Sequence, residues 1–240
     1  MTDLITHPWK RIFVALDTTD VGHAVALAQG LKGLVGGVKV GKEFFTANGP
    51  DGVHRITECG MPLFLDLKYH DIPNTVASAI RAALPLNPFM LNVHASGGRR
   101  MMVAATEAAN EAKAENRPIV LGVTVLTSMA REDLVEVGVD VEPLEQVLRL
   151  GKLAKSSGLD GVVCSAKEVV ALRGSVGENF KLVVPGIRPA WASADDQRRI
   201  VTPKDAVDLG ADYLVIGRPI TGHADPIEAA RLIAEELSET

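Results

Sequence analysis

The chain contains the stretch Met61-Pro62-Leu63-Phe64-Leu65-Asp66-Leu67-Lys68-Tyr69-His70-Asp71-Ile72-Pro73-Asn74-Thr75, in which an apolar run leads into a row of charged side chains. The apolar run predicts a buried strand, and Asp66 and Lys68, two residues apart at its end, are expected on one face. Asp71 adds a second carboxylate directly afterwards. Charges so close to a buried strand are costly to desolvate unless they pair or take part in chemistry. The stretch therefore predicts a strand whose end carries the reaction centre.

The same strand pattern recurs along the whole chain. Short β-branched runs alternate with Ala- and Leu-rich stretches of helical period, which is typical of βα units around a parallel sheet. The predicted strands are residues 11–17, 37–41, 62–68, 89–94, 118–124, 161–165, 181–187 and 213–217. The predicted helices include residues 21–32, 52–58, 74–83, 98–114, 143–156, 167–172, 203–209 and 226–237. Eight such units leave no room for a second domain, so residues 1–240 are predicted to form one (β/α)8 TIM barrel.

An open, doubly wound sheet is the alternative fold. The position of the polar residues separates the two, because a barrel gathers the C-terminal ends of all its strands around one mouth. Polar side chains lie at or just past nearly every predicted strand end: Asp17, Lys39, Asp66, Lys68, His94, Thr127, Ser165, Arg188 and Arg218. An open sheet would spread them along a line. The pattern favours the barrel, with the active site at the C-terminal ends of its strands.

Composition and charge limit the possible partners. Hydrophobic residues make up 47% of the 240 residues, and the formal net charge is −5 without a basic block, so nothing indicates nucleic-acid binding. No apolar run is long enough to cross a bilayer, and residues 1–10 lack the apolar stretch of a secretory signal. Cys59 and Cys164 lie far apart without metal-ligand spacing. We therefore expect a cytoplasmic protein without a nucleic-acid or membrane partner.

The first candidate constellation combines Lys39, Asp66, Lys68 and Asp71. A lysine between carboxylates stays protonated, because each neighbouring negative charge favours the charged form. Lys68 is therefore expected to donate a proton rather than to act as a base. Lys39, at the end of the second strand, can supply the second cation that the carboxylates need. The alternative is a purely structural network of salt bridges at the strand ends.

The second candidate constellation is an anion site. Barrels frequently bind phosphate at the loops after the seventh and eighth strands, where glycine permits close backbone approach. Gly217 and Arg218 follow the eighth strand, and Arg188 follows the seventh. The polar stretch of residues 188–200 is long for a βα loop and is interpreted as a lid from which Gln197 reaches a bound phosphate. A turn with solvated charges and a surface loop are the alternatives.

Other polar residues carry weaker signals. His94 is more simply a hydrogen-bonded histidine at the barrel mouth than a metal ligand, since no second histidine lies at a fitting spacing. Thr127 and Ser128 follow the fifth strand and could donate hydrogen bonds to a heterocycle or cap the next helical turn.

With these residues in view, the chain resembles the bacterial type of orotidine 5′-phosphate decarboxylase over nearly its whole length. An Asp-x-Lys-x-x-Asp core is shared by a wider superfamily, whereas its continuation through residues 72–75, together with Gln197 and Gly217-Arg218, is more specific. The matching segments are Ala15-Leu16-Asp17, Val38-Lys39-Val40-Gly41, Phe64-Leu65-Asp66-Leu67-Lys68, Asp71-Ile72-Pro73-Asn74-Thr75, Asn92-Val93-His94-Ala95, Leu126-Thr127-Ser128, Val184-Pro185-Gly186-Ile187-Arg188 and Ile216-Gly217-Arg218-Pro219-Ile220.

The resemblance implies a role for each candidate residue. Lys68 would be the proton donor, flanked by Asp66 and Asp71, with Lys39 completing the network. Asp71 and Thr75 would enter the active site of the neighbouring subunit, which makes a homodimer the functional unit. The implied substrate contacts are Asp17 and Lys39 to the ribose, Thr127 and Ser128 to the pyrimidine, and Arg188, Gln197, Gly217 and Arg218 to the phosphate.

The implied reaction converts orotidine 5′-monophosphate to uridine 5′-monophosphate in de novo pyrimidine biosynthesis, without metal or organic cofactor. Loss of carbon dioxide would leave a C6 carbanion, which the Lys68 ammonium would stabilise and protonate. Three alternatives remain at this point. They are a magnesium-dependent sugar-phosphate decarboxylase or aldolase of the same superfamily, a sugar-phosphate isomerase or epimerase barrel, and a catalytically silent phosphate-binding or scaffold protein.

Overall fold

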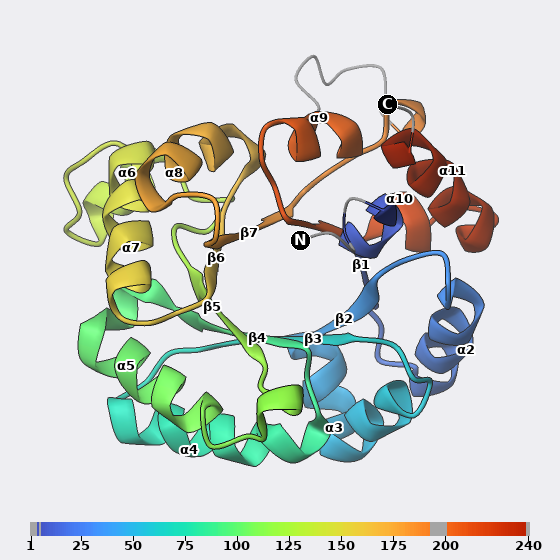
Figure 1. Ribbon diagram of the computed structural model, residues 1–240, viewed down its shortest axis with the longest axis horizontal. Coiled ribbons are helices and arrows are strands. Elements are labelled where there is room, and N and C mark those ends of the chain that lie inside the picture. Colours follow the sequence, from blue (N-terminus) through green and yellow to red (C-terminus); the bar gives the residue numbers. More distant parts are fainter. Residues whose placement is uncertain (1–3, 5, 193–200, 239–240) are drawn as a thin grey trace.

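The computed structural model describes residues 4, 6–192 and 201–238. Their parallel strands close into a barrel in chain order, and the helices form an outer ring (Figure 1). The strands are β1 (Ile12–Ala15), β2 (Gly37–Gly41), β3 (Leu63–Tyr69), β4 (Met90–His94), β5 (Ile119–Val123), β6 (Gly161–Val163), β7 (Lys181–Pro185) and β8 (Tyr213–Ile216). The predicted barrel is confirmed. The open sheet is excluded because β1 pairs with β8 as well as with β2.

The helices largely follow the predicted pattern. They are α2 (Val21–Leu31), α3 (Lys42–Thr57), α4 (Pro73–Ala83), α5 (Gly98–Ala109), α6 (Arg131–Glu136), α7 (Pro143–Ser156), α8 (Val169–Val176), α9 (Pro203–Asp208), α10 (Arg218–Thr221) and α11 (Pro226–Ser238). Short 3-10 turns are η1 (Pro8–Arg11), η2 (Leu84–Leu86), η3 (Ala95–Gly97), η4 (Ala114–Asn116), η5 (Ala166–Glu168) and η6 (Ala190–Ala192).

The main departures from the predicted helices have local causes. Helix α3 begins at Lys42 rather than at residue 52, because the chain resumes its helix after a kink at Gly49, where φ is 59°, and Pro50. Helices α6 and α10 were not predicted. With 6 and 4 residues, they are too short to show a helical period.

Two apolar clusters hold the barrel, one on each side of its strands. Alternation along each strand sends one set of side chains outward to the helices and the other into the barrel. On β4, for example, Leu91 belongs to the outer cluster and Met90 to the inner one. Phe13, Phe64 and Tyr213 also belong to the inner cluster, which fills the barrel below its polar mouth.

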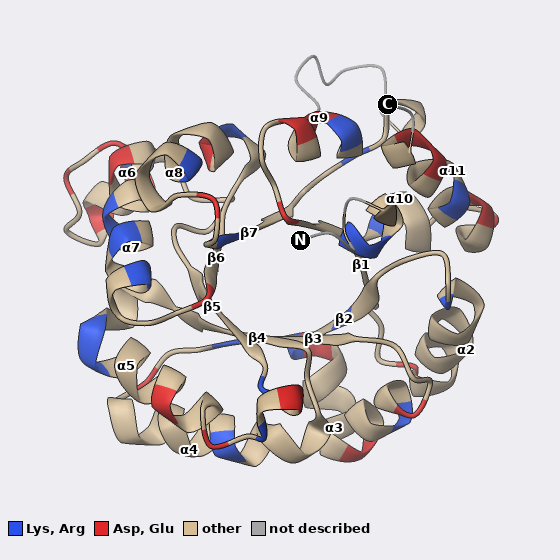
Figure 2. Cartoon of the chain, in the orientation of Figure 1, with Lys and Arg blue, Asp and Glu red and all other residues tan. Residues whose placement is uncertain are grey.

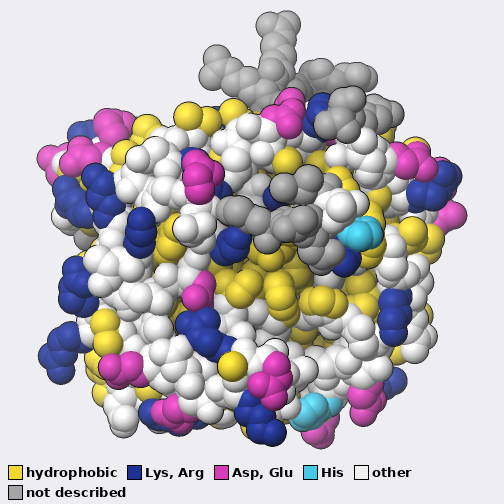
Figure 3. Space-filling model, viewed as in Figure 1, with side chains coloured by type: hydrophobic (Ala, Val, Ile, Leu, Met, Phe, Trp, Pro, Cys, Tyr) yellow, Lys and Arg dark blue, Asp and Glu magenta, His cyan; other side chains and the backbone are white. Residues whose placement is uncertain are grey.

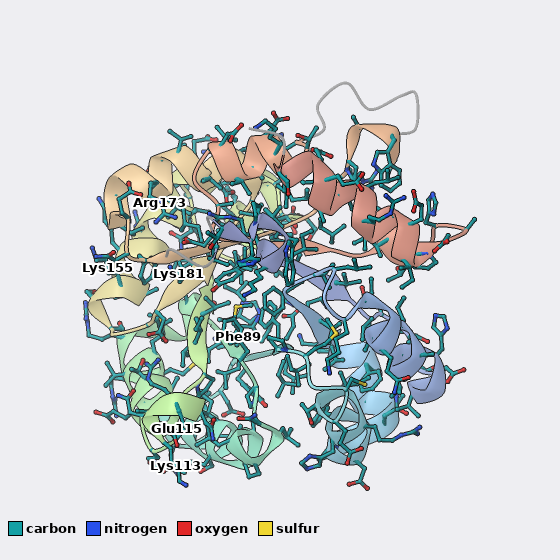
Figure 4. All side chains as sticks on the ribbon, turned by 45° about the vertical axis from the view of Figure 1, so that its right-hand side comes forward. Phe89, Lys113, Glu115, Lys155, Arg173 and Lys181 are labelled. Carbon is teal, nitrogen blue, oxygen red and sulfur yellow. The ribbon has the colours of Figure 1, made fainter. Side chains whose placement is uncertain are left out.

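The N-terminal face of the barrel carries contacts that stabilise the fold. The ring centroid of Phe13 lies 5.8 Å from that of Phe89 and 5.6 Å from that of Tyr213. Hydrophobic side chains gather at the centre of the ring of strands (Figure 3). Nearby, the buried carboxylate of Asp212 pairs with Arg173 at 2.8 Å and with Lys181 at 3.2 Å, which joins α8, β7 and the start of β8. Arg173 and Lys181 are labelled in Figure 4.

Charged side chains of both signs are interspersed over the outer helices (Figure 2), in agreement with the absence of a basic block from the sequence. Among the helices that the structure describes, none combines the length and the apolar character needed to span a membrane.

Candidate active site

The C-terminal ends of the first three strands bring four charged side chains into one chain of ion pairs. Lys68 Nζ lies 2.6 Å from Asp66 Oδ1, and Lys39 Nζ lies 3.4 Å from Asp66 Oδ2. Lys39 Nζ also donates a hydrogen bond to Asp17 Oδ1 at 3.2 Å. The order Lys68–Asp66–Lys39–Asp17 alternates cation and anion, so each inner group faces two opposite charges.

Burial increases toward the middle of this chain of ion pairs. The side chains of Lys39 and Asp66 are 9% and 12% exposed, whereas those of Lys68 and Asp17 are 26% and 60% exposed. Charge interactions are strongest where water is excluded. The Asp66 carboxylate is therefore compensated from both sides in the least solvated part of the network, while the Lys68 ammonium stays accessible from the mouth.

The backbone of β3 departs from regular strand geometry in this segment. Leu65 pairs with Leu91 and Tyr69 pairs with Val93, so β3 advances by four residues while β4 advances by two. Lys68 lies inside this bulge with a φ of 53°, in the left-handed region that a side chain disfavours. Asp66 and Lys68 do meet, as predicted, but a bulge brings them together rather than regular strand alternation.

Two adjoining cavities open at the mouth. A cavity of about 220 Å³ is lined by Asp66, Lys68 and Thr127, and one of about 660 Å³ by Arg188 and Arg218. Both cavities are also lined by Lys39, Pro185 and Val215. The result is an elongated hollow with the Lys68–Asp66 pair at one end, two guanidinium groups at the other, and Lys39 between them.

Eight predicted site residues of the described chain line this hollow. They are Asp17, Lys39, Asp66, Lys68, Thr127, Arg188, Gly217 and Arg218. Gln197 lies outside the described residues, together with most of the stretch interpreted as a lid.

Three predicted site residues lie away from the hollow within one chain. Asp71 is exposed, and its Oδ1 accepts a hydrogen bond from the backbone N–H of Ile72 at 2.6 Å. Thr75 is exposed in the first turn of α4, and Ser128 is exposed beyond β5. None of the three lines either cavity. The predicted flanking of Lys68 by two acids is therefore met within the chain by Asp66 but not by Asp71.

The structure adds residues that sequence reasoning missed. Trp191 and His223 both line the larger cavity, and their rings meet edge to face with centroids 5.5 Å apart. Trp191 was noted only as part of a loop, and His223 was not singled out, although it follows Gly217-Arg218 closely. Asn92, quoted only within a motif, contacts both Asp66 and Lys68.

His94 lies half-buried beside the charged network. Burial lowers the pKa of its imidazole, and the nearby positive charges of His70, Lys42 and Lys68 lower it further, against an opposing effect of Asp66. In the described part of the chain, no three His, Cys, Asp or Glu side chains are grouped to hold a metal ion.

Comparison with known proteins identifies the family. The model of the "Orotidine 5'-phosphate decarboxylase / HUMPS family" matches residues 10–233. The chain belongs to this family. An orotidine 5′-phosphate decarboxylase of Rhodospirillum rubrum is 57% identical over 230 residues, covering 94% of this chain and 93% of that protein. One of Paramagnetospirillum magneticum is 53% identical over 229 residues, covering 94% and 97%.

A solved structure agrees with this assignment to the orotidine 5′-phosphate decarboxylase / HUMPS family. The crystal structure of orotidine 5′-phosphate decarboxylase from Lactobacillus acidophilus matches with a TM-score of 0.84 and 39% sequence identity, covering 94% of this chain and 98% of that one. The resemblance inferred from the sequence motifs is thus confirmed at the level of the family.

The lowered pKa of His94 has a measurable consequence. Its ring should titrate below the value it has in the urea-unfolded chain, about 6.5. The unfolded chain then binds the proton more tightly, so His94 contributes fully to stability above about pH 6.5, and this contribution falls as the pH drops through its folded pKa. Ring NMR, with the signal assigned through His94→Asn, gives the two pKa values. Equal values in the folded and unfolded chains would contradict the burial argument.

Proposed function

We propose that this chain converts orotidine 5′-monophosphate to uridine 5′-monophosphate in de novo pyrimidine biosynthesis. The observation that carries the proposal is the elongated hollow, with the Lys68–Asp66 pair at one end and Arg188 and Arg218 at the other. Relatives that are named for this activity match the chain over more than nine-tenths of its length. A nucleotide matches the two ends of the hollow, because its phosphate and its base are attached at opposite ends of the ribose.

The binding roles follow from this orientation. The phosphate binds the guanidinium groups of Arg188 and Arg218, with Gly217 beside them, and Gln197 is proposed as a further contact. The ribose hydroxyls bind Asp17 and Lys39 at the middle of the hollow. The pyrimidine lies in the smaller cavity, where Thr127 is available as a hydrogen-bond partner, and Ser128 is proposed to join it on binding.

The chemistry requires a cation beside C6 of the pyrimidine. When the bond from C6 to the carboxylate breaks, its electron pair stays on C6 in the plane of the ring, where the π system delocalises it poorly. The Lys68 ammonium stabilises this charge as it develops and then transfers a proton to it, forming the C6–H bond. The resulting neutral amine regains its proton from solvent. Neither a metal nor an organic cofactor is needed for these steps.

Asp66 orients the proton donor before substrate binds. At 2.6 Å from Lys68 Nζ, its carboxylate fixes the ammonium in the smaller cavity, so little reorganisation is required as charge develops. Lys39 holds the second oxygen of Asp66 and links the reacting end of the hollow to the ribose end. Phosphate binding at the remote arginines then contributes to turnover by holding C6 against Lys68.

We also propose that the functional unit is a homodimer in which Asp71 and Thr75 complete the partner's active site. Both residues are exposed and lie outside the hollow of their own chain, and Ile72 between them is an apolar side chain that is 67% exposed. The 240 residues are proposed to act as one domain in the cytoplasm, where the two buried, unpaired cysteines suit a reducing environment.

The decarboxylase proposal is tested by a spectrophotometric assay with orotidine 5′-monophosphate. Replacing Lys68 by Ala should lower kcat at least about 1,000-fold because it removes both the stabilising charge and the proton donor. Uridine 5′-monophosphate should still bind, since Arg188 and Arg218 are unchanged. The matched control, Lys152→Ala, changes an exposed lysine on α7 and should leave turnover intact. Wild-type turnover that disappears with a chelator and returns with magnesium would favour the metal-dependent alternative.

The shared active site is tested by mixing two inactive variants. Lys68→Ala and Asp71→Ala homodimers are unfolded together and refolded at equal concentrations. If Asp71 acts across the interface, each hybrid dimer has one intact site, and random pairing should restore about a quarter of wild-type activity. The control mixture of Lys68→Ala with Arg218→Ala should stay inactive, because those two residues serve the same site. No recovery in the first mixture would contradict the cross-subunit role of Asp71.

A further inference from the structure

Asn92 is a fully buried polar residue on β4 that contacts the side chain of Asp66 and the backbone of Lys68 on β3. Its Nδ2 donates a hydrogen bond to Asp66 Oδ1 at 2.7 Å, and its Oδ1 accepts one from the backbone N–H of Lys68 at 2.8 Å. The partners fix the orientation of the amide, because a carboxylate can only accept and a backbone N–H can only donate. One side chain therefore holds the carboxylate of Asp66 and the backbone of Lys68 at once.

The place of Asn92 in the strand makes these bonds necessary. Its neighbours Leu91 and Val93 belong to the outer apolar cluster and Met90 to the inner one, so Asn92 faces the barrel interior by alternation. An unpaired amide there would be costly, since water does not reach it. Both of its polar atoms instead find their partners in the β3 bulge.

The β3 bulge needs such a partner. The extra residues of β3 disrupt its regular pairing with β4, and Lys68 adopts a left-handed φ of 53° that a side chain disfavours. A conformation of this kind persists only when its surroundings hold it in place. The hydrogen bond from the Lys68 N–H to Asn92 is such a restraint, and it acts at the residue whose ammonium is proposed to react.

Asp66 Oδ1 accepts from Asn92 Nδ2 and also contacts Lys68 Nζ, whereas Oδ2 faces Lys39 Nζ at 3.4 Å. Because the Asn92 amide on β4 binds one oxygen of Asp66, it restrains rotation of this carboxylate toward either lysine. The amide thus fixes the direction in which Asp66 presents the Lys68 ammonium.

We propose that Asn92 is a positioning residue for the reaction, which holds the β3 bulge and the Asp66 carboxylate so that the Lys68 ammonium is aimed at the substrate. This inference rests on the proposed function, because it concerns the group that protonates C6. Asn92 itself lines neither cavity, so the proposed role acts through Asp66 and Lys68. The role requires a donor and an acceptor in one buried side chain, which an aliphatic residue of the same size cannot supply.

Two substitutions separate hydrogen bonding from packing. Asn92→Leu keeps most of the volume and removes both bonds, whereas Asn92→Ala leaves space in which a water molecule can donate to Asp66 and accept from Lys68. If Asn92 positions the reacting groups, kcat for orotidine 5′-monophosphate should fall about 100-fold in Asn92→Leu and distinctly less in Asn92→Ala, with KM changed little in either. If Asn92 only fills space, the order of the two variants should reverse.

Val93→Ala is the matched control. It removes buried volume from the neighbouring position of β4 on the face that packs against the helices, so it should lower the melting temperature and leave kcat unchanged. All variants are compared at equal folded fraction, measured by circular dichroism. A folded Asn92→Leu variant with wild-type kcat, or a Val93→Ala variant with an equal loss of kcat, would overturn the proposal.

A crystal structure of the Asn92→Leu variant, which removes both hydrogen bonds without leaving room for a water molecule, gives a readout that is independent of activity. The bulge should relax, with Lys68 leaving its left-handed φ and its ammonium moving away from Asp66. An unchanged bulge and ion pair would overturn the proposal even if turnover had fallen. Wild-type protein without decarboxylase activity would instead refute the proposed function, while the structural outcome would still test whether Asn92 holds the bulge.

Discussion

A buried carboxylate, Asp66, lies between two lysines, and the rest of the active site is arranged around this interaction. An unpaired carboxylate at this depth would cost on the order of several kcal/mol. Lys68, Lys39 and the amide of Asn92 all face it, each from 3.4 Å or less. These partners come from β2, β3 and β4, so the parallel pairing of three neighbouring strands brings them together. The same contacts leave the Lys68 ammonium pointing into a cavity with its position already set.

One end of the barrel stabilises the fold, and the other end carries the proposed chemistry. At the N-terminal face, the Phe13–Phe89–Tyr213 rings and the ion pairs of Asp212 join elements that are distant in sequence. At the opposite end, the strands finish in polar side chains around the two cavities. The rigid N-terminal half of the barrel allows the mouth to hold strained features such as the left-handed backbone at Lys68. The arginines at the far end of the hollow supply binding energy away from the reacting carbon.

Much of this architecture could be predicted from the sequence, because βα alternation and polar strand ends are local patterns with long-range consequences. The residues that sequence reasoning could not place have physical reasons in common. The β3 bulge depends on pairing with β4, which no local pattern shows, and the role of Asn92 depends on that bulge. The kink at Gly49 interrupts α3, so the first half of this helix was not recognised from the sequence. Asp71 and Thr75 lie outside the hollow of their own chain, so their proposed roles depend on a second subunit.

The most direct measurement of the central claim is a crystal structure of the protein with uridine 5′-monophosphate bound. Lys68 Nζ should lie about 3–3.5 Å from C6 of the pyrimidine while still paired with Asp66, and the phosphate should contact Arg188 and Arg218. A nucleotide bound in the reverse direction, or a Lys68 ammonium out of reach of C6, would contradict the claim that this cation stabilises and protonates the carbanion.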